Sequence, residues 1–339
     1  VSDIYIITVP TPLKENNKPD IFYVKTAIKS ISKILKNGDM IILESTSPVG
    51  TTEKITSWLK AARPELNYPH KKYQNKCISI AYCPERVIPG NTINELINND
   101  RIIGGVSKNC AKKAIKFYNL FVNGHCEATD AKTAEMVKLV ENTYRDVNIA
   151  FSNELSILCD DLDINVWNLI KFSNKHPRVN ILQPGPGVGG HCIAIDPWFL
   201  IDNSHNKAKL MKAARDVNII KTEYIKNKIR KEILNFKNNI TVACFGITYK
   251  ANVSDYRESP ALNIAEEIQN HLIKKLLIVE PNLDYLPKNL LKENVMLSSI
   301  NEAIEKADLL ILLVDHDEFK SIKKSQLSSK KIIDTKGFW

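Results

Sequence analysis

The 339-residue sequence lacks the features that would assign it to a membrane-spanning, disulfide-bonded or zinc-binding class. None of its apolar runs approaches the roughly eighteen residues that a bilayer-spanning helix needs, and its start shows no basic-then-apolar signal pattern. Its seven cysteines are scattered, odd in number and without a C-x-x-C pair, which is typical of reduced thiols. We therefore expect a cytoplasmic protein with no membrane segment, no disulfide framework and no bound metal.

The sequence also lacks a concentrated basic surface, although its formal net charge is +9. Its lysine pairs are short and widely separated, and no basic helix face with interleaved aromatic residues is present. We therefore expect no nucleic-acid partner, whereas an anionic small substrate suits the positive charge. A hydrophobic content of 44% and a charged content of 25% are ordinary for a globular protein, and the length allows two or three domains.

Glycine is scarce, and its distribution marks one loop. Four of the twelve glycines lie between Gly185 and Gly190, shortly before Cys192. Asp196 follows Cys192, and because Pro197 disfavours helical backbone angles at the residue before it, we expect a loop there as well. A thiol on a glycine-lined loop with an acid nearby suits a covalent nucleophile. The alternative is a structural cysteine buried beside a glycine turn, the commoner environment of a lone cysteine.

The first part of the chain alternates apolar strands with amphipathic helices, which predicts an α/β fold with a parallel sheet. The predicted strands are 4–9, 40–43, 78–82 and 101–104 with a short one near 127, and the predicted helices are 21–35, 51–62 and 109–121. Polar residues follow three of these strands, at 8–11, 45–46 and 83–86. Because ligands bind beyond the carboxyl ends of strands in such sheets, these ends are candidates for one site, although each alone is also typical of an ordinary turn.

A long helical pattern from Asp130 to about Leu162 separates this region from a second α/β region. Lys138, Asn142 and Arg145 share one face of that helix, which is typical either of a functional site or of a solvated polar stripe. The further predicted elements are helices at 166–172 and 208–234 and strands at 240–245, 276–279, 309–314 and 332–333. The expected domains are 1–128, 129–236 and 237–339.

Eight short motifs occur in order along the chain. They are VPTP (9–12), STSPVGT (45–51), CPERV (83–87), KLVENTYRDVNIAFSNEL (138–155), GPGVGGHCIAIDP (185–197), FGITYK (245–250), RESPAL (257–262) and DTKG (334–337). Together they resemble the nucleotide-sugar dehydrogenases, the family that includes UDP-glucose and GDP-mannose dehydrogenases. The GVGGHCIAIDPWF segment, and Pro89 where many UDP-glucose dehydrogenases carry a second acid, resemble the UDP-N-acetyl-D-mannosamine dehydrogenase branch.

The resemblance implies an NAD-dependent oxidoreductase that oxidises the primary alcohol of a UDP-sugar to a carboxylate in two steps. In the branch it resembles, UDP-N-acetyl-D-mannosamine becomes UDP-N-acetyl-D-mannosaminuronate for a bacterial surface polysaccharide. Cys192 would hold the aldehyde and then the acyl group covalently. Lys138 would assist proton transfer, Asn142 would hydrogen-bond to the same oxygen, and Asp196 would position Lys138 or the hydrolytic water.

The same resemblance implies residues for the water, the cofactor and the substrate. Thr46 would hold the hydrolytic water, and Glu85 would assist hydrolysis of the thioester. NAD would contact Thr11, Thr46 and Arg257. The implied substrate contacts are Arg86, Val87, Arg145, His176, Arg178, Gly187, Tyr249, Lys250 and Lys336. For Lys336 alone, ordinary surface charge is the favoured interpretation. A homodimer through the long helix is the implied assembly.

One feature of the family is missing from this sequence. Members begin with a strand, a G-x-G-x-x-G turn and a helix that bind the NAD pyrophosphate, and no such turn precedes Val9. The resemblance therefore implies an N-terminally truncated Rossmann-like sheet, a central long-helix domain and a smaller Rossmann-like domain that binds the UDP-sugar. The chain is either a fragment or a true truncation, whose unpaired strand edges would favour aggregation. Two alternatives stay open: a dehydrogenase of UDP-glucose or another UDP-N-acetylhexosamine, and a non-catalytic UDP-sugar-binding remnant.

Overall fold

The computed structural model describes residues 2–69, 77–87 and 91–339. The chain divides into two compact units: unit 1 is Val1–Thr143 with Ile195–Lys209, and unit 2 is Tyr144–Ala194 with Leu210–Trp339. The boundaries of the three expected domains remain a prediction. Within the described ranges, no helix combines the length and the apolarity that crossing a membrane requires.

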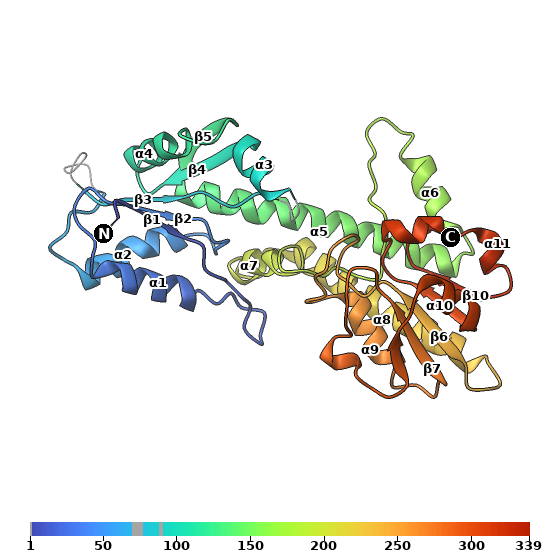
Figure 1. Cartoon of the computed structure of the whole chain (residues 1–339). Helices are drawn as coiled ribbons and strands as arrows, with labels where there is room; N and C mark the ends of the chain where they lie inside the picture. Colours follow the sequence, from blue (N-terminus) through green and yellow to red (C-terminus); the bar gives the residue numbers. More distant parts are fainter. Residues whose placement is uncertain (1, 70–76, 88–90) are drawn as a thin grey trace. The chain divides into compact units, whose positions relative to one another are not determined.

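The described residues of unit 1 form a five-stranded sheet in the order β1-β2-β3-β4-β5 (Figure 1). The strands are β1 (Ile4–Ile7), β2 (Met40–Leu43), β3 (Ser79–Tyr82), β4 (Arg101–Gly105) and β5 (Cys126–Asp130). β1 pairs in parallel with β2, β2 with β3, and β4 with β5. These strands lie where the apolar runs of the sequence predict them.

One strand pair departs from the expected parallel sheet. β3 and β4 run antiparallel, with Ala81 opposite Gly105 and Tyr82 opposite Gly104. The described part of the connection between them holds the short helix α3 (Thr92–Asn98), and none of the residues of α3 is buried. A parallel crossover uses a helix that packs on the sheet. Because α3 does not pack in this way, the chain returns antiparallel along β4, and the expectation of a purely parallel sheet is wrong at this pair.

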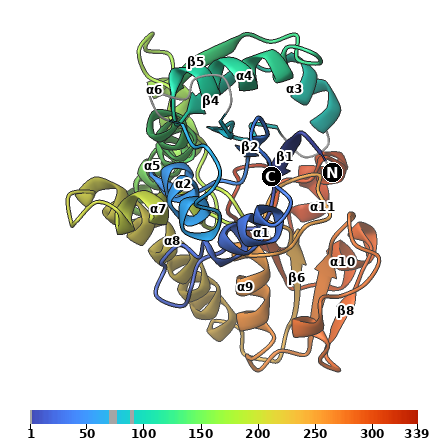
Figure 2. The ribbon, with the colours of Figure 1, turned by 90° about the vertical axis from the view of Figure 1, so that its left-hand side faces the viewer.

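Helices cover both faces of this sheet, as the alternating pattern predicts. α1 (Phe22–Ser32) and α2 (Thr51–Ala62) lie side by side (Figures 1 and 2), and α2 buries Leu59 against one face. α4 (Lys108–Tyr118) buries Tyr118 against the other face. All four residues of β2 are buried between the two layers, which explains why this strand is a continuous apolar run.

Helix α5 (Ala131–Asp161) is continuous and begins in unit 1. The Asp130 carboxylate accepts a hydrogen bond from the Thr133 N–H at 3.0 Å, which is the geometry of the predicted N-cap. One turn further on, Glu135 accepts from the N–H and the hydroxyl of Thr52 at 2.7 and 2.6 Å. The amino-terminal part of α5 therefore also satisfies polar groups at the amino end of α2.

Unit 2 contains the second predicted sheet, whose five strands are all parallel in the order β10-β9-β6-β7-β8. The strands are β6 (Thr241–Phe245), β7 (Lys275–Val279), β8 (Val295–Leu297), β9 (Leu309–Leu312) and β10 (Lys331–Asp334). The edge strand β8 was not predicted, because so short a strand shows little periodicity. Helix α7 (Asp196–Asp202) lies in unit 1. The other helices of the described residues are α6 (Val166–Ser173), α8 (Lys209–Leu234), α9 (Pro260–Ile268), α10 (Ile300–Lys306) and α11 (Lys324–Leu327), with 3-10 helices η1 (Lys288–Leu290) and η2 (Asp317–Ser321).

Candidate active site

Three of the predicted catalytic residues lie together in unit 1. Lys138 and Asn142 are one turn apart on α5, on the shared face that their spacing predicts. The Lys138 ammonium donates to the main-chain carbonyl of Glu85 at 2.7 Å, and the Asn142 amide donates to Asp196 Oδ2 at 2.5 Å. Lys138 and Asp196 are only 7% and 3% exposed. The site therefore holds an ammonium and a carboxyl group that are both largely withdrawn from water.

The segment at Asp196 is a helix rather than the expected loop. Helix α7 begins at Asp196 and carries Pro197 in its first turn. Proline is tolerated there because the N–H that it lacks would have no partner within the helix, and its fixed φ suits the first turn. The preference of a residue before proline for extended backbone is therefore overridden at Asp196.

Burial raises the pKa of Asp196 to about 6. The hydrogen bond from Asn142 and the charge of Lys138 oppose this increase, while the charge of Glu85 adds to it. A carboxyl group with such a pKa exchanges its proton close to neutral pH. Asp196 is therefore suited to moving a proton or orienting water beside a reacting oxygen.

The polar ends of β1 and β2 meet at the carboxyl edge of the sheet of unit 1. Thr11 Oγ1 donates to the main-chain carbonyl of Thr46 at 2.7 Å, and both threonines are half-buried. Two threonines at this edge suit contacts to a dinucleotide. The residues described by the structure include no G-x-G-x-x-G turn that joins a strand directly to a helix. Among the described residues, the groups that fit NAD are those at these strand ends.

The CPERV segment lies at the third predicted strand end, after β3. The Glu85 side chain is exposed, and its carboxylate accepts a hydrogen bond from the Val87 N–H. Arg86 pairs with Glu141 of α5 at 2.8 Å, and its guanidinium donates to the carbonyl of Asp100 at 3.1 Å. Val87 is half-buried. The structure thus brings this segment against the helix that carries Lys138, whereas Pro89 lies outside the described residues.

Unit 2 encloses a cavity of about 390 Å³ beside the glycine loop. It is lined by that loop, by residues 248–251 after β6, and by residues that follow β9 and β10. Lys336 pairs with Asp315 at 3.1 Å across the last two strand ends. Five of the predicted substrate contacts line this cavity: Arg145, Gly187, Tyr249, Lys250 and Lys336. The cavity therefore lies at the carboxyl edge of the second sheet, where parallel sheets bind ligands.

Two glycines in the loop are required by close contacts. Gly187 has φ +143°, and a Cβ there would lie 2.2 Å from the Thr222 hydroxyl. Gly190 has φ +81°, and a Cβ there would lie 2.8 Å from the Tyr249 ring. Both positions need the left-handed backbone and the absence of a side chain that only glycine combines. The loop consequently packs directly on Tyr249 a short distance before Cys192.

Cys192 is exposed in this loop, whereas the other six cysteines, all within the described ranges, are buried or half-buried. The alternative of a buried structural cysteine is therefore wrong for Cys192. An exposed thiol is accessible to a substrate, which a covalent nucleophile requires.

A buried amide network supports the start of the glycine loop. The side-chain oxygen Oδ1 of Asn153 accepts a hydrogen bond from the Gly185 N–H at 2.9 Å. The side-chain Nδ2 of Asn153 donates to Asn218 Oδ1 at 2.9 Å. Asn218 in turn donates to Asp146 Oδ1 at 2.8 Å, which also accepts from Arg215 at 2.6 Å. Asn153 and Asn218 were not among the predicted site residues. Asn153 lies within the 138–155 motif, and a polar residue at a buried helical position is the signal that marks it.

Three predicted residues of unit 2 do not line the cavity. His176 and Arg178 are both exposed in the segment after α6, where the Arg178 N–H donates to His176 Nδ1 at 3.4 Å. The Arg257 guanidinium is paired with Asp255, at 2.9 Å from Nε and 2.8 Å from Nη2. Their roles remain predictions.

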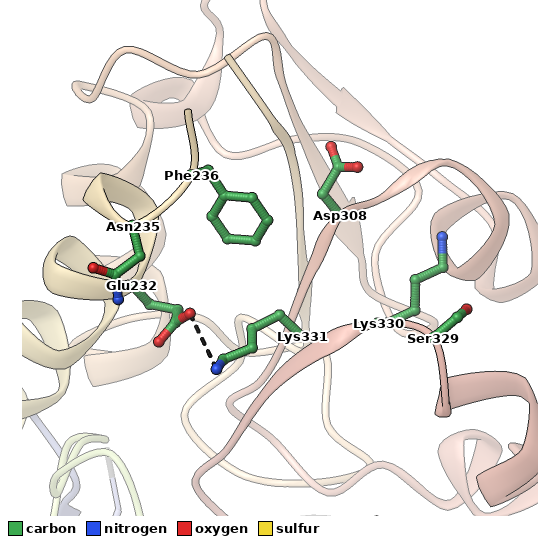
Figure 3. A pocket seen from close by; sticks show the side chains of 7 residues that line it. All are labelled: Glu232, Asn235, Phe236, Asp308, Ser329, Lys330 and Lys331. Atoms are coloured by element: carbon green, nitrogen blue, oxygen red, sulfur yellow. Dashed lines mark ion pairs between the residues drawn. The ribbon is translucent and has the colours of Figure 1, made fainter. Parts of the chain in front are cut away.

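A further cavity of about 420 Å³ lies at the opposite edge of the second sheet (Figure 3). It is lined by Glu232, Asn235, Phe236, Asp308, Ser329, Lys330 and Lys331. Lys331 begins β10 and pairs with Glu232 at 3.4 Å, and Asp308 immediately precedes β9. This is the amino edge of the strands, where ligands of parallel sheets seldom bind. It holds none of the predicted site residues.

The chain matches three family models in sequence order. They are the NAD binding domain of the UDP-glucose/GDP-mannose dehydrogenase family over residues 1–122, its central domain over 132–219 and its UDP binding domain over 243–339. The chain belongs to the UDP-glucose/GDP-mannose dehydrogenase family. Membership confirms the predicted class, an NAD-dependent oxidoreductase that acts on a UDP-sugar.

Individual relatives cover nearly all of the chain. It is 48% identical over 338 residues to an NDP-N-acetyl-D-galactosaminuronic acid dehydrogenase of Ralstonia nicotianae, covering 100% of this chain and 79% of the relative. It is 50% identical over 330 residues to a UDP-N-acetyl-D-mannosamine dehydrogenase of Campylobacter jejuni, covering 97% and 81%. Among solved structures, a UDP-D-ManNAc dehydrogenase of Pyrococcus horikoshii matches with a TM-score of 0.86 at 36% identity, covering 100% and 78%. The α/β architecture with a long central helix is therefore confirmed.

Proposed function

We propose that this dehydrogenase oxidises UDP-N-acetyl-D-mannosamine to UDP-N-acetyl-D-mannosaminuronate, for a bacterial surface polysaccharide. The observation that carries the proposal is the set of relatives at 47% to 50% identity that are named UDP-N-acetyl-D-mannosamine dehydrogenases. A second candidate, another UDP-N-acetylhexosamine, is favoured by the galactosaminuronic acid dehydrogenase at 48% identity. UDP-glucose is the third, because the family model includes UDP-glucose dehydrogenases.

The residues of unit 1 would handle the protons of the reaction. Bound NAD would accept hydride in each of the two oxidation steps. The Lys138 ammonium would stabilise the oxygen from which the alcohol proton departs, and the Asn142 amide would donate to the same oxygen. Asp196, as a carboxylate, would hold Lys138 in place or orient the water. Thr46 and Glu85 would assist that water, and Thr11 with Thr46 would contact the cofactor.

Cys192 would carry the intermediate between the two oxidation steps. Its thiolate adds to the aldehyde carbon, forming a C–S bond, and the carbonyl oxygen takes up a proton. Loss of that proton and of the second hydride gives a thioester. Attack by water then breaks the C–S bond, so that the carboxylate leaves and the thiolate is restored. The accessibility of this thiol supports the assignment.

The cavity of unit 2 would bind the nucleotide part of the substrate. Arg145, Lys250 and Lys336 supply cationic groups suited to a diphosphate, and the Tyr249 ring supplies an apolar face. The matched UDP binding domain over residues 243–339 supports this placement. We further propose a domain division at 1–128, 129–236 and 237–339, which the three matched family ranges support.

The substrate assignment is tested by NADH formation and uronate analysis with the 339-residue chain. We expect turnover of UDP-N-acetyl-D-mannosamine with the highest kcat/KM among that sugar, UDP-N-acetyl-D-galactosamine and UDP-glucose. Faster oxidation of either competitor would overturn the substrate assignment and leave the reaction class intact.

A second measurement separates an enzyme from a non-catalytic binding remnant. NADH is titrated into the chain and followed by fluorescence, with and without UDP-N-acetyl-D-mannosamine. Saturable NADH binding is expected for the enzyme. Binding of the UDP-sugar without any NADH binding or turnover would instead support the remnant.

A further inference from the structure

Glu280 and His316 form a buried pair to which no role is assigned above. Both side chains are 0% exposed, and His316 Nε2 lies 3.1 Å from the Glu280 carboxylate. Glu280 directly follows β7, and His316 lies in the segment that follows β9. The pair therefore occupies the carboxyl edge of the second sheet, the edge that also borders the cavity.

Glu280 holds the start of the loop that follows β6. Its Oε2 accepts from the N–H of Ile247 at 2.7 Å and from that of Thr248 at 3.3 Å, and its Oε1 accepts from the Asn282 N–H at 3.1 Å. Burial raises the pKa of Glu280, but the hydrogen bond from His316, together with those from the backbone N–H groups, lowers it below its ordinary value. Glu280 therefore acts as a charged acceptor for several backbone donors.

His316 holds the other end of the same loop. Its Nδ1 accepts from the Asn252 N–H at 3.0 Å. Because Nδ1 is an acceptor, the ring proton is on Nε2, which faces Glu280 and also lies 3.3 Å from the Thr248 hydroxyl. Thr248 donates in turn to the carbonyl of Lys250 at 3.0 Å. The pair thus fixes both ends of the segment 247–252.

This segment carries Tyr249 and Lys250 into the cavity, while neither Glu280 nor His316 lines it. In dinucleotide-binding sheets, an acid at a strand end beyond the phosphate loop hydrogen-bonds to a ribose. Glu280 has a comparable position, but its oxygens are occupied by backbone N–H groups and by His316. The carboxylate is therefore directed to the protein backbone instead of a ligand.

We propose that Glu280 and His316 are positioning residues that fix the segment 247–252, and thereby set the affinity of the cavity for the nucleotide of the UDP-sugar. The inference rests on the proposed function of that cavity. It assigns the pair to substrate affinity and not to the chemical steps.

The test measures UDP binding by titration calorimetry with the 339-residue chain. His316→Leu removes both ring nitrogens, and we expect UDP to bind about ten- to hundredfold more weakly. His316→Gln keeps an amide donor that can reach Glu280, so we expect it to recover part of the affinity. Amide hydrogen exchange at Ile247, Thr248 and Asn252 is expected to be fastest in His316→Leu and intermediate in His316→Gln.

Phe319→Leu is the matched control. Phe319 is fully buried, and its ring packs edge-on against His316 with the two ring centroids 5.4 Å apart. Its side chain has no polar atom, so the change removes packing and no hydrogen bond. We expect a lower Tm and UDP binding within about threefold of the unaltered chain. The proposal would be overturned if Phe319→Leu weakened UDP binding as much as His316→Leu does. It would also be overturned if His316→Leu bound UDP within about threefold of the unaltered chain. If the unaltered chain binds neither UDP nor the UDP-sugar, the proposed function fails. Unchanged amide exchange in His316→Leu would instead refute the positioning role.

Discussion

Cys192 is the single residue on which the proposed covalent route depends. A serine hydroxyl is a much weaker nucleophile at neutral pH, so Cys192→Ser is expected to reduce carboxylate formation at least about hundredfold. Binding of the UDP-sugar should remain within about twofold, because the change removes little contact area. Uronate is measured by mass spectrometry, and affinity by calorimetry.

The matched control for this variant is Cys126→Ser, which alters a half-buried cysteine to which no site role is assigned. It should leave turnover unchanged. Two-step turnover at the unaltered rate in Cys192→Ser would refute the covalent route.

Asp196 makes stability and activity depend on pH in opposite directions. Its pKa in the folded chain is about 6, above the ordinary value of 3.8, so folding favours the protonated form. The resulting stabilisation is fully present below pH 3.8 and is lost as pH rises through about 6. If the carboxylate acts on Lys138 or water, the rate should rise over the same interval.

Chemical denaturation between pH 4 and 7, together with rate measurements, checks this expectation. In Asp196→Asn, the contribution of Asp196 to the pH dependence of the unfolding free energy should disappear. The reaction rate should be low over the whole interval. An unaltered pH dependence of stability in Asp196→Asn would contradict the assigned pKa. A variant rate equal to that of the unaltered chain would contradict the proposed role.

At the scale of elements, the glycine loop depends on close packing against the segment after β6. Gly190→Ala places a Cβ 2.8 Å from the Tyr249 ring at a backbone φ of +81°. The left-handed backbone alone costs about 1–2 kcal/mol, and the contact requires a shift of the loop or the ring. We expect lower stability. We also expect the rate of Cys192 alkylation by iodoacetamide to change: it should be faster if the loop is released and slower otherwise.

Thermal denaturation and alkylation kinetics measure these two effects. Gly38→Ala is the matched control, because Gly38 also has positive φ, at +106°, but a Cβ there would meet nothing within 4 Å. It should lose stability without any change in Cys192 reactivity. An unchanged alkylation rate in Gly190→Ala would show that this contact does not shape the loop around the thiol.

At the scale of the whole molecule, the long helix carries the apolar side chains expected of an assembly surface. Five large apolar side chains of α5 are exposed, with exposed fractions from 41% to 70%: Met136, Val140, Tyr144, Phe151 and Leu158. Monomeric proteins seldom leave several large apolar side chains exposed on one helix. We therefore keep the homodimer as a prediction and expect twice the chain mass of 38.4 kDa in solution.

Light scattering measures this mass directly. Phe151→Glu places a charge in the exposed apolar series and should shift the protein toward the monomer. Leu291→Glu alters a 67% exposed leucine away from α5 and should leave the dimer intact. A monomer in the unaltered protein would contradict the predicted assembly.

Much of the fold could be predicted from local pattern. The strand Met40–Leu43 is a continuous apolar run because both of its faces are buried, and Asp130 precedes α5 because its carboxylate caps the first turn. The direction of β4 was not predictable, because it depends on whether the preceding segment packs on the sheet. The helix at Asp196 differs from the expected loop because Pro197 disfavours helical backbone at the residue before it but is also favoured in the first turn of a helix.

The sequence by itself determined the family, the alternation of strands and helices, and the choice of Cys192 as the candidate nucleophile. Residue types in a fixed order along the chain carry that information. Tertiary structure alone decided that Asp196 is buried against Asn142, that Tyr249 packs on Gly190, and that Glu280 and His316 bind a backbone segment. These contacts join residues far apart in the chain. Burial and hydrogen-bond partners depend on which elements pack together, and no local pattern records that.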